Sequence, residues 1–339
     1  MIKSDTGAAP SGLSRRNALK LAAVAGGASA GALFSGVSFA QEAAPAAATD
    51  ASTGMPNWRR IALGEASVTI ILDGLRPGEG PHPTFGENQS AEAVAELMRT
   101  NFLPETRIVT SFLPVLVEMG ENLVLFDTGF GPGGRENGQG RLVERMAQAG
   151  YAPGDVDIVV LTHMHGDHIG GLMEGDVAAF PNARYVAGQV EYDFWISEEA
   201  KNGPRAQNAA AVEKLVVPMK DKMTFVAEGD EIVPGIVAYE AFGHSPGHLV
   251  FEITSGERSL WLTADSANHF VASLQRPDWE VRFDMDKAAG IASRRKVFDR
   301  IAEARAPFIG YHMPFPGVGF VEKDGEGYRY VPLTYQLDV

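Results

Sequence analysis

From about residue 58 onward, the hydrophobic and polar positions follow two kinds of pattern, one typical of β-strands and one typical of α-helices. Short runs such as 68–72 and 158–161 are rich in β-branched and apolar residues and are bounded by polar or turn-forming ones, which is typical of buried strands. Longer segments such as 90–98 and 287–304 have the length and apolar spacing of helices, and Ser90 is a suitable N-cap residue. Because strands occur in runs, with helices between and after them, the pattern predicts two mixed sheets with helices outside.

The same pattern predicts the remaining elements. Strands are expected at 60–73, which holds two, and at 112–119, 123–126, 184–187, 224–226, 236–242, 250–254, 260–262, 307–310 and 328–331. Further helices are expected at 141–149 and near 190–195. Two segments rich in glycine or proline, 76–87 and 129–140, are expected to be loops.

Residues 1–40 have the features of an export signal and are expected to be removed rather than to join the fold. Arg15 and Arg16 precede a weakly apolar stretch that ends in small residues, which favours a twin-arginine signal cleaved near Ala40. Ala18 stands where such signals usually carry phenylalanine, so the general secretory route stays open. Glycines and serines within the stretch disfavour a stable membrane anchor. The mature protein is therefore expected in the periplasm or outside the cell.

Residues 41–56 are rich in alanine, proline, serine and threonine and are expected to form a disordered linker, which leaves 57–339 as one domain. The chain has 339 residues and no cysteine, which excludes disulfides and thiolate metal ligands. Its formal net charge is −14, and loss of residues 1–40, whose charges sum to +3, would leave −17. Such an acidic chain repels phosphate backbones, and nucleic acid is not expected as a partner.

The predicted strand at 158–161 is followed by four metal-binding side chains within six residues, namely His163, His165, Asp167 and His168. Residues two apart in an extended segment point to the same side, so His163 and His165 can hold one ion together. Gly166 allows a sharp turn that can direct Asp167 and His168 to a second point nearby. The alternative is a polar loop whose histidines bond to the backbone, but this density of ligand types after an apolar strand favours a metal site.

Four more side chains complete a recognisable pattern: Asp127 in the segment 125–129, His244 in 243–248, Asp265 in 262–265 and His312 in 310–314. With these partners in this order, the chain from about Trp58 onward resembles the metallo-β-lactamase superfamily. It looks closest to the methyl parathion hydrolase group in the segments 162–165, 170–173, 179–183, 193–195, 315–319 and 327–332. The resemblance implies an αβ/βα sandwich of two mixed β-sheets with helices on the outer faces.

The resemblance also implies a dinuclear metal centre. One ion would be held by His163, His165 and His244, the second by Asp167, His168 and His312, and both would be bridged by Asp265. Neutral imidazoles and carboxylates suit zinc, although iron, manganese and cobalt stay open. The two ions would share a hydroxide that attacks ester-type bonds, with Asp167 and Asp265 as the catalytic carboxylates. Asp127, and in the same way His248, would orient ligand histidines by a hydrogen bond to the ring nitrogen that does not bind the metal.

Within the superfamily, the resemblance implies a hydrolase for organophosphate triesters and aryl esters. The alternative is hydrolysis of N-acyl homoserine lactones or other lactones, although Asn268 stands where such lactonases usually place a tyrosine. Asn268, His269, Phe130 and Trp195 are expected to line the substrate pocket, and Trp195 aligns with a pocket aromatic of the methyl parathion hydrolase group. The substrate is thus expected to be a small neutral or hydrophobic ester, lactone or phosphotriester. The sequence leaves open whether the chain forms a homodimer.

Two further interpretations come from other classes of protein. The segment 243–247 matches G-x-S-x-G, and Ser245, Asp265 and His312 follow in the order of a serine hydrolase triad. That motif needs a helix directly after the serine, whereas Pro246 and the alternating segment 249–253 predict a turn and a strand. A non-hydrolytic iron or redox protein of the same fold would use nearly the same ligands, so the sequence does not exclude it.

Overall fold

The computed structural model of the protein describes residues 56–335. The predicted signal at 1–40 and nearly all of the predicted linker at 41–56 lie outside the described residues. Within 56–335, no helix combines the length and the apolar character that a membrane crossing requires.

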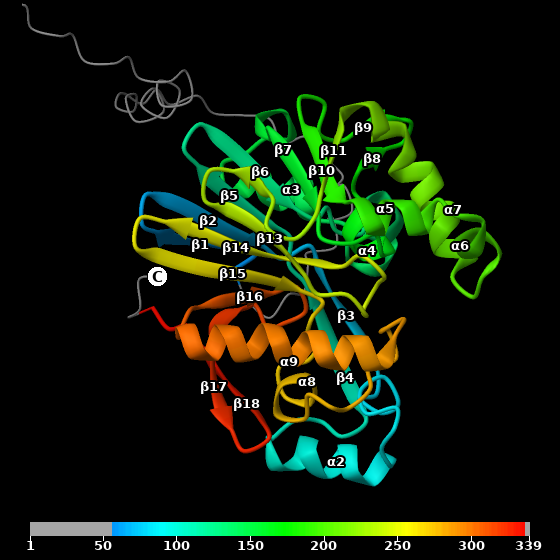
Figure 1. Cartoon of the computed structure of the whole chain (residues 1–339), viewed down its shortest axis with the longest axis vertical. Helices are drawn as coiled ribbons and strands as arrows, with labels where there is room; N and C mark the ends of the chain where they lie inside the picture. Colours follow the sequence, from blue (N-terminus) through cyan, green and yellow to red (C-terminus); the bar gives the residue numbers. More distant parts are fainter. Residues whose placement is uncertain (1–55, 336–339) are drawn as a thin grey trace, which may run out of the picture. The chain divides into compact units, whose positions relative to one another are not determined.

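Two seven-stranded sheets face each other across a shared hydrophobic core (Figure 1). The first has the spatial order β1 (Trp58–Leu63), β2 (Ala66–Ile71), β5 (Val115–Met119), β6 (Asn122–Phe126), β7 (Ile158–Leu161), β10 (Arg184–Gly188) and β11 (Met223–Val226). The second has the order β12 (Glu231–Val233), β13 (Ile236–Glu240), β14 (Leu249–Ser255), β15 (Arg258–Ala264), β16 (Phe308–Gly310), β17 (Val318–Asp324) and β18 (Gly327–Pro332). Both sheets are mixed, because β6, β7, β10 and β11 are parallel neighbours in the first, and β15 and β16 in the second.

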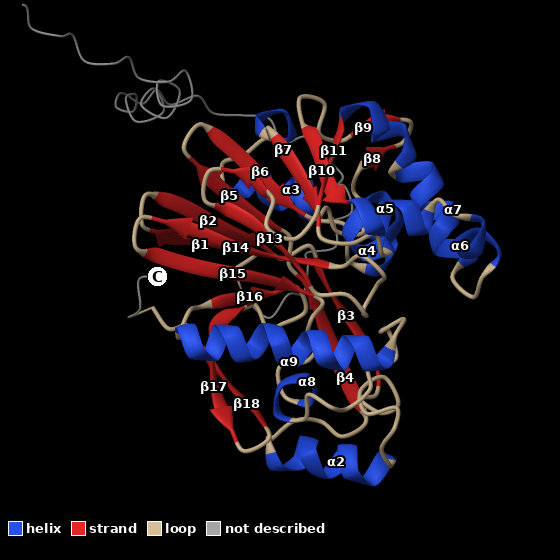
Figure 2. Cartoon of the chain, in the orientation of Figure 1, coloured by secondary structure: helices blue, strands red, loops and turns tan. Residues whose placement is uncertain are grey.

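Residues along the strands alternate between the shared core and an outer face on which helices pack (Figure 2). In β7, Val160 belongs to the shared core, whereas Val159 belongs to the outer cluster with α3 (Leu142–Gln148), α5 (Gln189–Trp195) and α7 (Ala206–Leu215). On the second sheet, Trp261 of β15 packs with Phe298 of the long helix α9 (Lys287–Ala304). This layering confirms the predicted αβ/βα sandwich, and it follows from the period-two alternation of the strands.

Some elements differ from those expected. The segment 76–87, expected as a loop, overlaps β3 (Gly74–Glu79), which pairs with β4 (Arg107–Phe112) as an antiparallel ribbon. Proline and glycine lower the strand propensity of β3, and pairing with a strand distant in the sequence decides its conformation. The expected loop at 129–140 contains a 3-10 helix, η1 (Gly131–Asn137), and α7, rich in alanine, was not predicted because it lacks apolar periodicity.

The shorter elements complete the chain. They are α2 (Ala91–Thr100), η2 (Pro153–Asp155), α4 (Gly166–Ile169), β8 (Met173–Glu174), β9 (Val177–Ala178), α6 (Glu198–Asn202), η3 (Val217–Lys222) and α8 (Ala272–Gln275). Helix α2 begins as the sequence predicts, because the Ser90 hydroxyl accepts a hydrogen bond from the backbone N–H of Ala93.

The carboxyl ends of four strands meet at one edge of the sandwich. Asp127 follows β6, His163 lies two residues after β7, Asp265 follows β15, and His312 lies two residues after β16. Strands β6 and β7 are parallel neighbours, as are β15 and β16, so each sheet delivers two of these residues to the same edge. The fold therefore gathers the candidate ligands that the sequence keeps far apart.

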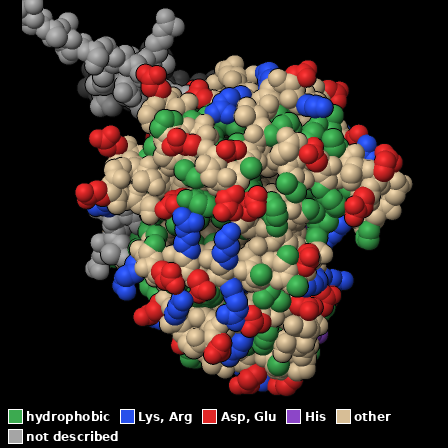
Figure 3. Space-filling model, viewed as in Figure 1, with side chains coloured by type: hydrophobic (Ala, Val, Ile, Leu, Met, Phe, Trp, Pro, Cys, Tyr) green, Lys and Arg blue, Asp and Glu red, His purple; other side chains and the backbone are tan. Residues whose placement is uncertain are grey.

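Acidic and basic side chains are interspersed on the face of the molecule that α9 covers (Figure 3). Two arginines of α9 form partly exposed ion pairs, Arg295 with Asp278 and Arg300 with Glu252. Such surface pairs each contribute little to stability, so these positions offer conservative control substitutions.

Candidate metal centre

The turn after β7 presents His163 with its imidazole fully buried. Thr162 donates its backbone N–H and its hydroxyl to the two carboxylate oxygens of Asp127, each at 2.9 Å. Because the hydroxyl hydrogen is used in this way, Nδ1 of His163 is the donor in its 3.1 Å contact with Thr162 Oγ1. Nε2 of His163 is therefore unprotonated, which is the state a metal ligand requires.

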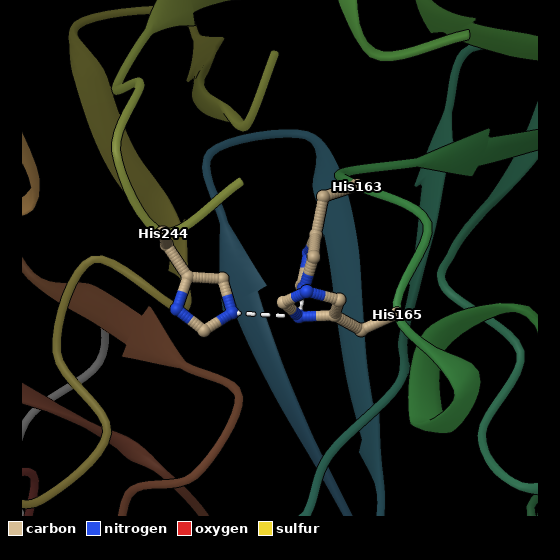
Figure 4. A group of neighbouring side chains, drawn as sticks. All are labelled: His163, His165 and His244. Carbon is tan, nitrogen blue, oxygen red and sulfur yellow. Dashed lines mark hydrogen bonds between the residues drawn. The ribbon is translucent and has the colours of Figure 1, made fainter. Parts of the chain in front are cut away.

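Three ring nitrogens converge in a first ligand group (Figure 4). Nδ1 of His165 lies 3.0 Å from Nε2 of His163 and 2.9 Å from Nε2 of His244. Nδ1 of His244 donates to Asp284 at 3.0 Å, and this bond directs its Nε2 at the same point. Lone pairs directed at one point repel each other unless a cation lies there. Zn–N bonds of about 2.0–2.1 Å give a tetrahedron with edges of roughly 3.3 Å, close to the observed spacings.

Asp167, His168 and His312 form a second ligand group. Nδ1 of His168 donates to Asp127 at 2.8 Å, and Nδ1 of His312 donates to the backbone carbonyl of Ser111 at 2.9 Å. The Nε2 atoms of both histidines lie 3.6 Å from Oδ2 of Asp167. Each imidazole is thus held through one nitrogen, and its other nitrogen is directed at the group.

Asp265 lies within reach of both groups. Its Oδ1 is 3.3 Å from Nε2 of His168, and its Oδ2 is 3.1 Å from Nε2 of His244 and from Nε2 of His312. Asn268 donates to Oδ2 at 2.9 Å. Oδ1 of Asp265 and Nε2 of His168 are buried and accept no hydrogen bond from the residues that the structure describes. Buried polar atoms are rarely left without a partner, so this geometry fits a pair of cations.

A left-handed backbone presents both buried carboxylates at the strand ends. Asp127 has φ +60°, and Ala264, directly before Asp265, has φ +42°. Non-glycine residues in this region cost roughly 1–3 kcal/mol each and persist where the surroundings demand the conformation, most often at functional sites. Close packing fixes the neighbouring turn, because a Cβ at Gly171 would lie 2.1 Å from the carbonyl oxygen of Thr128.

The electrostatics shift the ligand histidines in opposite directions, and the division does not follow the two groups. Burial opposes the charged form of His244, but the carboxylates of Asp265 and Asp284 outweigh it and raise its pKa to about 9. Burial, together with neighbouring imidazoles, lowers the pKa of His163 and of His165 well below the usual value. Burial also opposes the charged form of His168, but the carboxylate of Asp265 and others outweigh it and raise its pKa well above the usual value. Burial would raise the pKa of Asp265, but the surrounding imidazoles, that of His312 first, lower it well below its ordinary range. A neutral imidazole pair beside an anionic carboxylate suits metal binding.

Two buried groups that support the site were not predicted. Asp284 accepts from Nδ1 of His244 through Oδ1, and from Nη2 of Arg294 at 2.8 Å through Oδ2. Tyr311 donates its hydroxyl to the backbone carbonyl of Asp167 at 2.6 Å. Asp284 lies in a loop without a motif, so only its three-dimensional contacts reveal its role.

Glu191 joins the two loops that carry the first ligand group. Its carboxylate is buried and accepts four hydrogen bonds at 2.7–2.9 Å, from Met164 N, Trp195 Nε1, Ser245 Oγ and Gly247 N. The Ser245 hydroxyl is therefore bound to Glu191, and strand β14 rather than a helix follows its loop. This arrangement is not that of a serine nucleophile.

His248 lies behind Asp265 rather than behind a ligand histidine. Its Nδ1 donates to the carbonyl of Ala241 at 3.1 Å, and its Nε2 accepts from the backbone N–H of Asp265 at 3.1 Å. Burial lowers the pKa of His248 to about 3, which keeps the ring neutral for both bonds. His248 thus positions the backbone of Asp265.

A cavity of about 480 Å³ opens over the two ligand groups. Its wall includes four aromatic rings, those of Phe85, Phe112, Phe130 and Phe283. Two guanidinium groups, Arg76 and Arg205, and the amide of Asn268 add polar contacts. Phe130 and Asn268, which the sequence analysis expects at the substrate pocket, both line this cavity.

Two predicted pocket residues lie elsewhere. Trp195 is fully buried in the outer core, donates its Nε1–H to Glu191 and packs edge-on against the ring of His165, with 5.9 Å between the ring centroids. Its ring therefore supports a ligand histidine but does not line the cavity. His269 lines a separate hollow, and its Nδ1 accepts from the backbone N–H groups of Val271 and Ala272 at 3.0 Å. His269 therefore holds the turn that leads into the short helix α8 and does not line the cavity over the ligand groups.

Comparison with known proteins places this site in a family. The sequence profile of the Metallo-beta-lactamase superfamily matches residues 114–300. An N-acyl homoserine lactonase of Bacillus thuringiensis is 28% identical over 179 residues, which cover 46% of this chain and 64% of the lactonase, less than two thirds of its length. The dizinc quorum-quenching lactonase AidC, solved with a product, is 28% identical, with a TM-score of 0.77 over 82% of this chain and 98% of its own. The hydrolase AbOPH, at 24% identity and a TM-score of 0.76 over 83% of this chain and 99% of its own, shares the fold.

Proposed function

This chain belongs to the metallo-β-lactamase superfamily, and we propose that it is a hydrolase that opens lactone rings with two divalent metal ions, zinc first among them. The observation that carries the proposal is Asp265, whose carboxylate lies within 3.3 Å of ring nitrogens from both ligand groups. The likeness to a dizinc lactonase along 98% of that chain supports lactones as the substrate class. We therefore propose N-acyl homoserine lactones as the substrates, in place of the organophosphate triesters that the sequence resemblance implies.

The ligand atoms divide naturally between two ions. We assign the first ion to the imidazoles of His163, His165 and His244, the second to Asp167, His168 and His312, and Asp265 to both. Ions bound there would supply a water of lowered pKa as the nucleophile and would polarise the carbonyl oxygen under attack.

The residues around the ions position the reaction. Asp265 is held by Asn268 on its carboxylate and by His248 on its backbone, which sets the spacing between the two ligand groups. Asp167, whose side chain is 21% exposed, lies at the cavity floor. In ring opening, the water oxygen bonds to the carbonyl carbon, the ring C–O bond breaks, and a water proton passes to the departing oxygen. We assign that proton transfer to the carboxylate of Asp167.

The cavity itself favours an uncharged substrate. Its aromatic wall offers apolar surface for an acyl or aryl group. The same wall supports a second candidate class, aryl phosphotriesters and aryl esters, because an aromatic leaving group can stack on rings such as Phe130 and Phe112, whose centroids are 4.6 Å apart.

The substrate class is tested by a panel assayed on protein of known metal content. N-hexanoyl homoserine lactone should give the highest kcat/KM, at least a hundredfold above that of a nitrophenyl dialkyl phosphate and of nitrophenyl acetate. The reverse order would contradict lactone hydrolysis and would favour the second class. Failure to hydrolyse any of the three would refute a hydrolytic role at this centre.

We also propose that residues 1–40 direct the protein out of the cytoplasm through the twin-arginine route. Arg15 and Arg16 support this proposal, since a signal of this type carries both. Changing both to lysine should leave the uncleaved precursor in the cytoplasm. An unchanged periplasmic yield, measured by fractionation, would instead assign export to the general secretory route.

A further inference from the structure

Arg205 lies at the wall of the cavity, directly before α7. Its backbone carbonyl accepts from the N–H groups of Asn208 at 2.8 Å and Ala209 at 3.1 Å, so it belongs to the first turn of the helix. Asn208 donates its side-chain amide to the backbone carbonyl of Met164 at 2.8 Å. Because Met164 lies between two ligand histidines, this bond ties the start of α7 to the metal-binding turn.

The guanidinium of Arg205 is held by a backbone carbonyl rather than by a carboxylate. Many of the chain's arginines contact carboxylates, as Arg294 does with Asp284 and Arg135 with Glu174. Within 56–335, no carboxylate lies at ion-pair distance from Arg205, and its described bond is from Nη2 to the backbone carbonyl of Phe283 at 3.2 Å. A guanidinium has five N–H donors, so one carbonyl leaves most of them for a ligand.

The place of Arg205 relative to the ligand groups is favourable for a substrate contact. It lines the same cavity as His165 and His244. Phe283, whose backbone it binds, is 44% exposed and lines the cavity as well. A hydrogen-bond donor and an apolar ring therefore stand side by side at the cavity wall.

We propose that Arg205 determines substrate specificity by donating to the amide carbonyl of an acylamino substituent on the lactone. This inference rests on the proposed lactone hydrolysis. With the lactone carbonyl at the ligand groups, an amide carbonyl near Arg205 leaves the alkyl chain to lie against Phe283. A planar guanidinium suits a carbonyl oxygen, and no charge on the substrate is needed.

The test compares two lactones that differ in the amide. N-hexanoyl homoserine lactone carries it, and a γ-lactone with an alkyl substituent of similar length does not. Arg205→Gln should raise KM for the acylamino lactone roughly ten- to hundredfold, with kcat little changed, since a bond to a charged donor is lost. The same variant should leave the kinetics of the alkyl lactone unchanged. Arg205→Lys, which keeps the charge, should recover part of the loss.

Arg282→Gln is the matched control, because it removes the same charge from a neighbouring exposed position that does not line the cavity. It should behave as wild type on both lactones. An equal loss on both lactones with Arg205→Gln, or no loss on either, would overturn the inference. If the wild-type protein hydrolyses neither lactone, the proposed function fails. The role of Arg205 is then tested by measuring, with calorimetry, how tightly wild type and Arg205→Gln bind the two lactones. Weaker binding of only the acylamino lactone to the variant would then support its role, and any other binding pattern would refute it.

Discussion

Nδ1 of His244 donates to Oδ1 of Asp284 across 3.0 Å, although 40 positions separate the two residues in the sequence. The other oxygen of Asp284 accepts from Arg294 at 2.8 Å, which fixes the carboxylate in place. The bond sets the tautomer of His244, so that Nε2 faces the first ligand group. Asp284 thus orients a candidate metal ligand from outside the ligand group.

Replacing Asp284 with asparagine should weaken zinc binding about ten- to hundredfold, because the imidazole loses the anion that orients it and makes it basic. Competition with a chromophoric chelator measures the affinity. Asp278→Asn is the matched control, since it removes the same charge from an exposed pair with Arg295. Equal affinities for the two variants would contradict the assigned role of Asp284.

Asp265 should be the most damaging single ligand to replace. Asp265→Asn keeps the size of the side chain but removes the negative charge shared by both ligand groups, so metal content should fall at both sites. The rate should fall by more than about a hundredfold, the typical loss for one electrostatic group at a transition state. His312→Ala should mainly empty the second site and leave about one ion per chain. Two ions and near-native rates in Asp265→Asn would show that Asp265 is not the bridge.

Ser245→Ala should leave lactone turnover within about twofold of wild type, because the hydroxyl donates to Glu191 and does not face the cavity. Loss of that bond to a buried carboxylate should cost about 1.5–3 kcal/mol of unfolding free energy, measurable in urea. A loss of activity of a hundredfold or more with metal content intact would restore the serine interpretation.

Stability should fall between about pH 6.5 and pH 4 in part because of His269. Burial lowers its pKa to about 4, whereas the unfolded chain titrates near the ordinary value of about 6.5. The unfolded state therefore binds the proton first as the pH falls, and up to about 3 kcal/mol present above pH 6.5 is lost on the way to pH 4. His269→Asn keeps an acceptor for the N–H groups of Val271 and Ala272 but cannot titrate. Its unfolding free energy should depend less on pH in this window, and identical pH profiles would contradict the assignment.

Much of the fold follows from local pattern. The strand before His163 and the helix α9 have strong apolar signals, and both occur where the sequence predicts them. The ribbon of β3 and β4 could not be predicted in the same way. Proline and glycine weaken β3 locally, and its partner strand is separated from it by α2, so its pairing depends on contacts between distant segments.

The candidate site also contains residues that the sequence predicts and residues that it does not. The ligand residues occur in compact motifs whose chemistry is visible in the sequence, and the strand ends bring them together. Glu191 and Asp284 carry no motif, and their importance arises only when loops from different parts of the chain meet. Trp195 shows the opposite failure, since an aromatic residue near a motif belongs to the core more often than to a pocket.

The most direct test of the account measures metal content and lactone turnover in the same preparation. Purified protein should contain close to two zinc ions per chain and should hydrolyse N-hexanoyl homoserine lactone. Exhaustive chelation should remove both the ions and the activity, and added zinc should restore them together, with full turnover only at two equivalents. Turnover that survives complete removal of metal, or full recovery at one equivalent, would contradict a dinuclear hydrolytic centre.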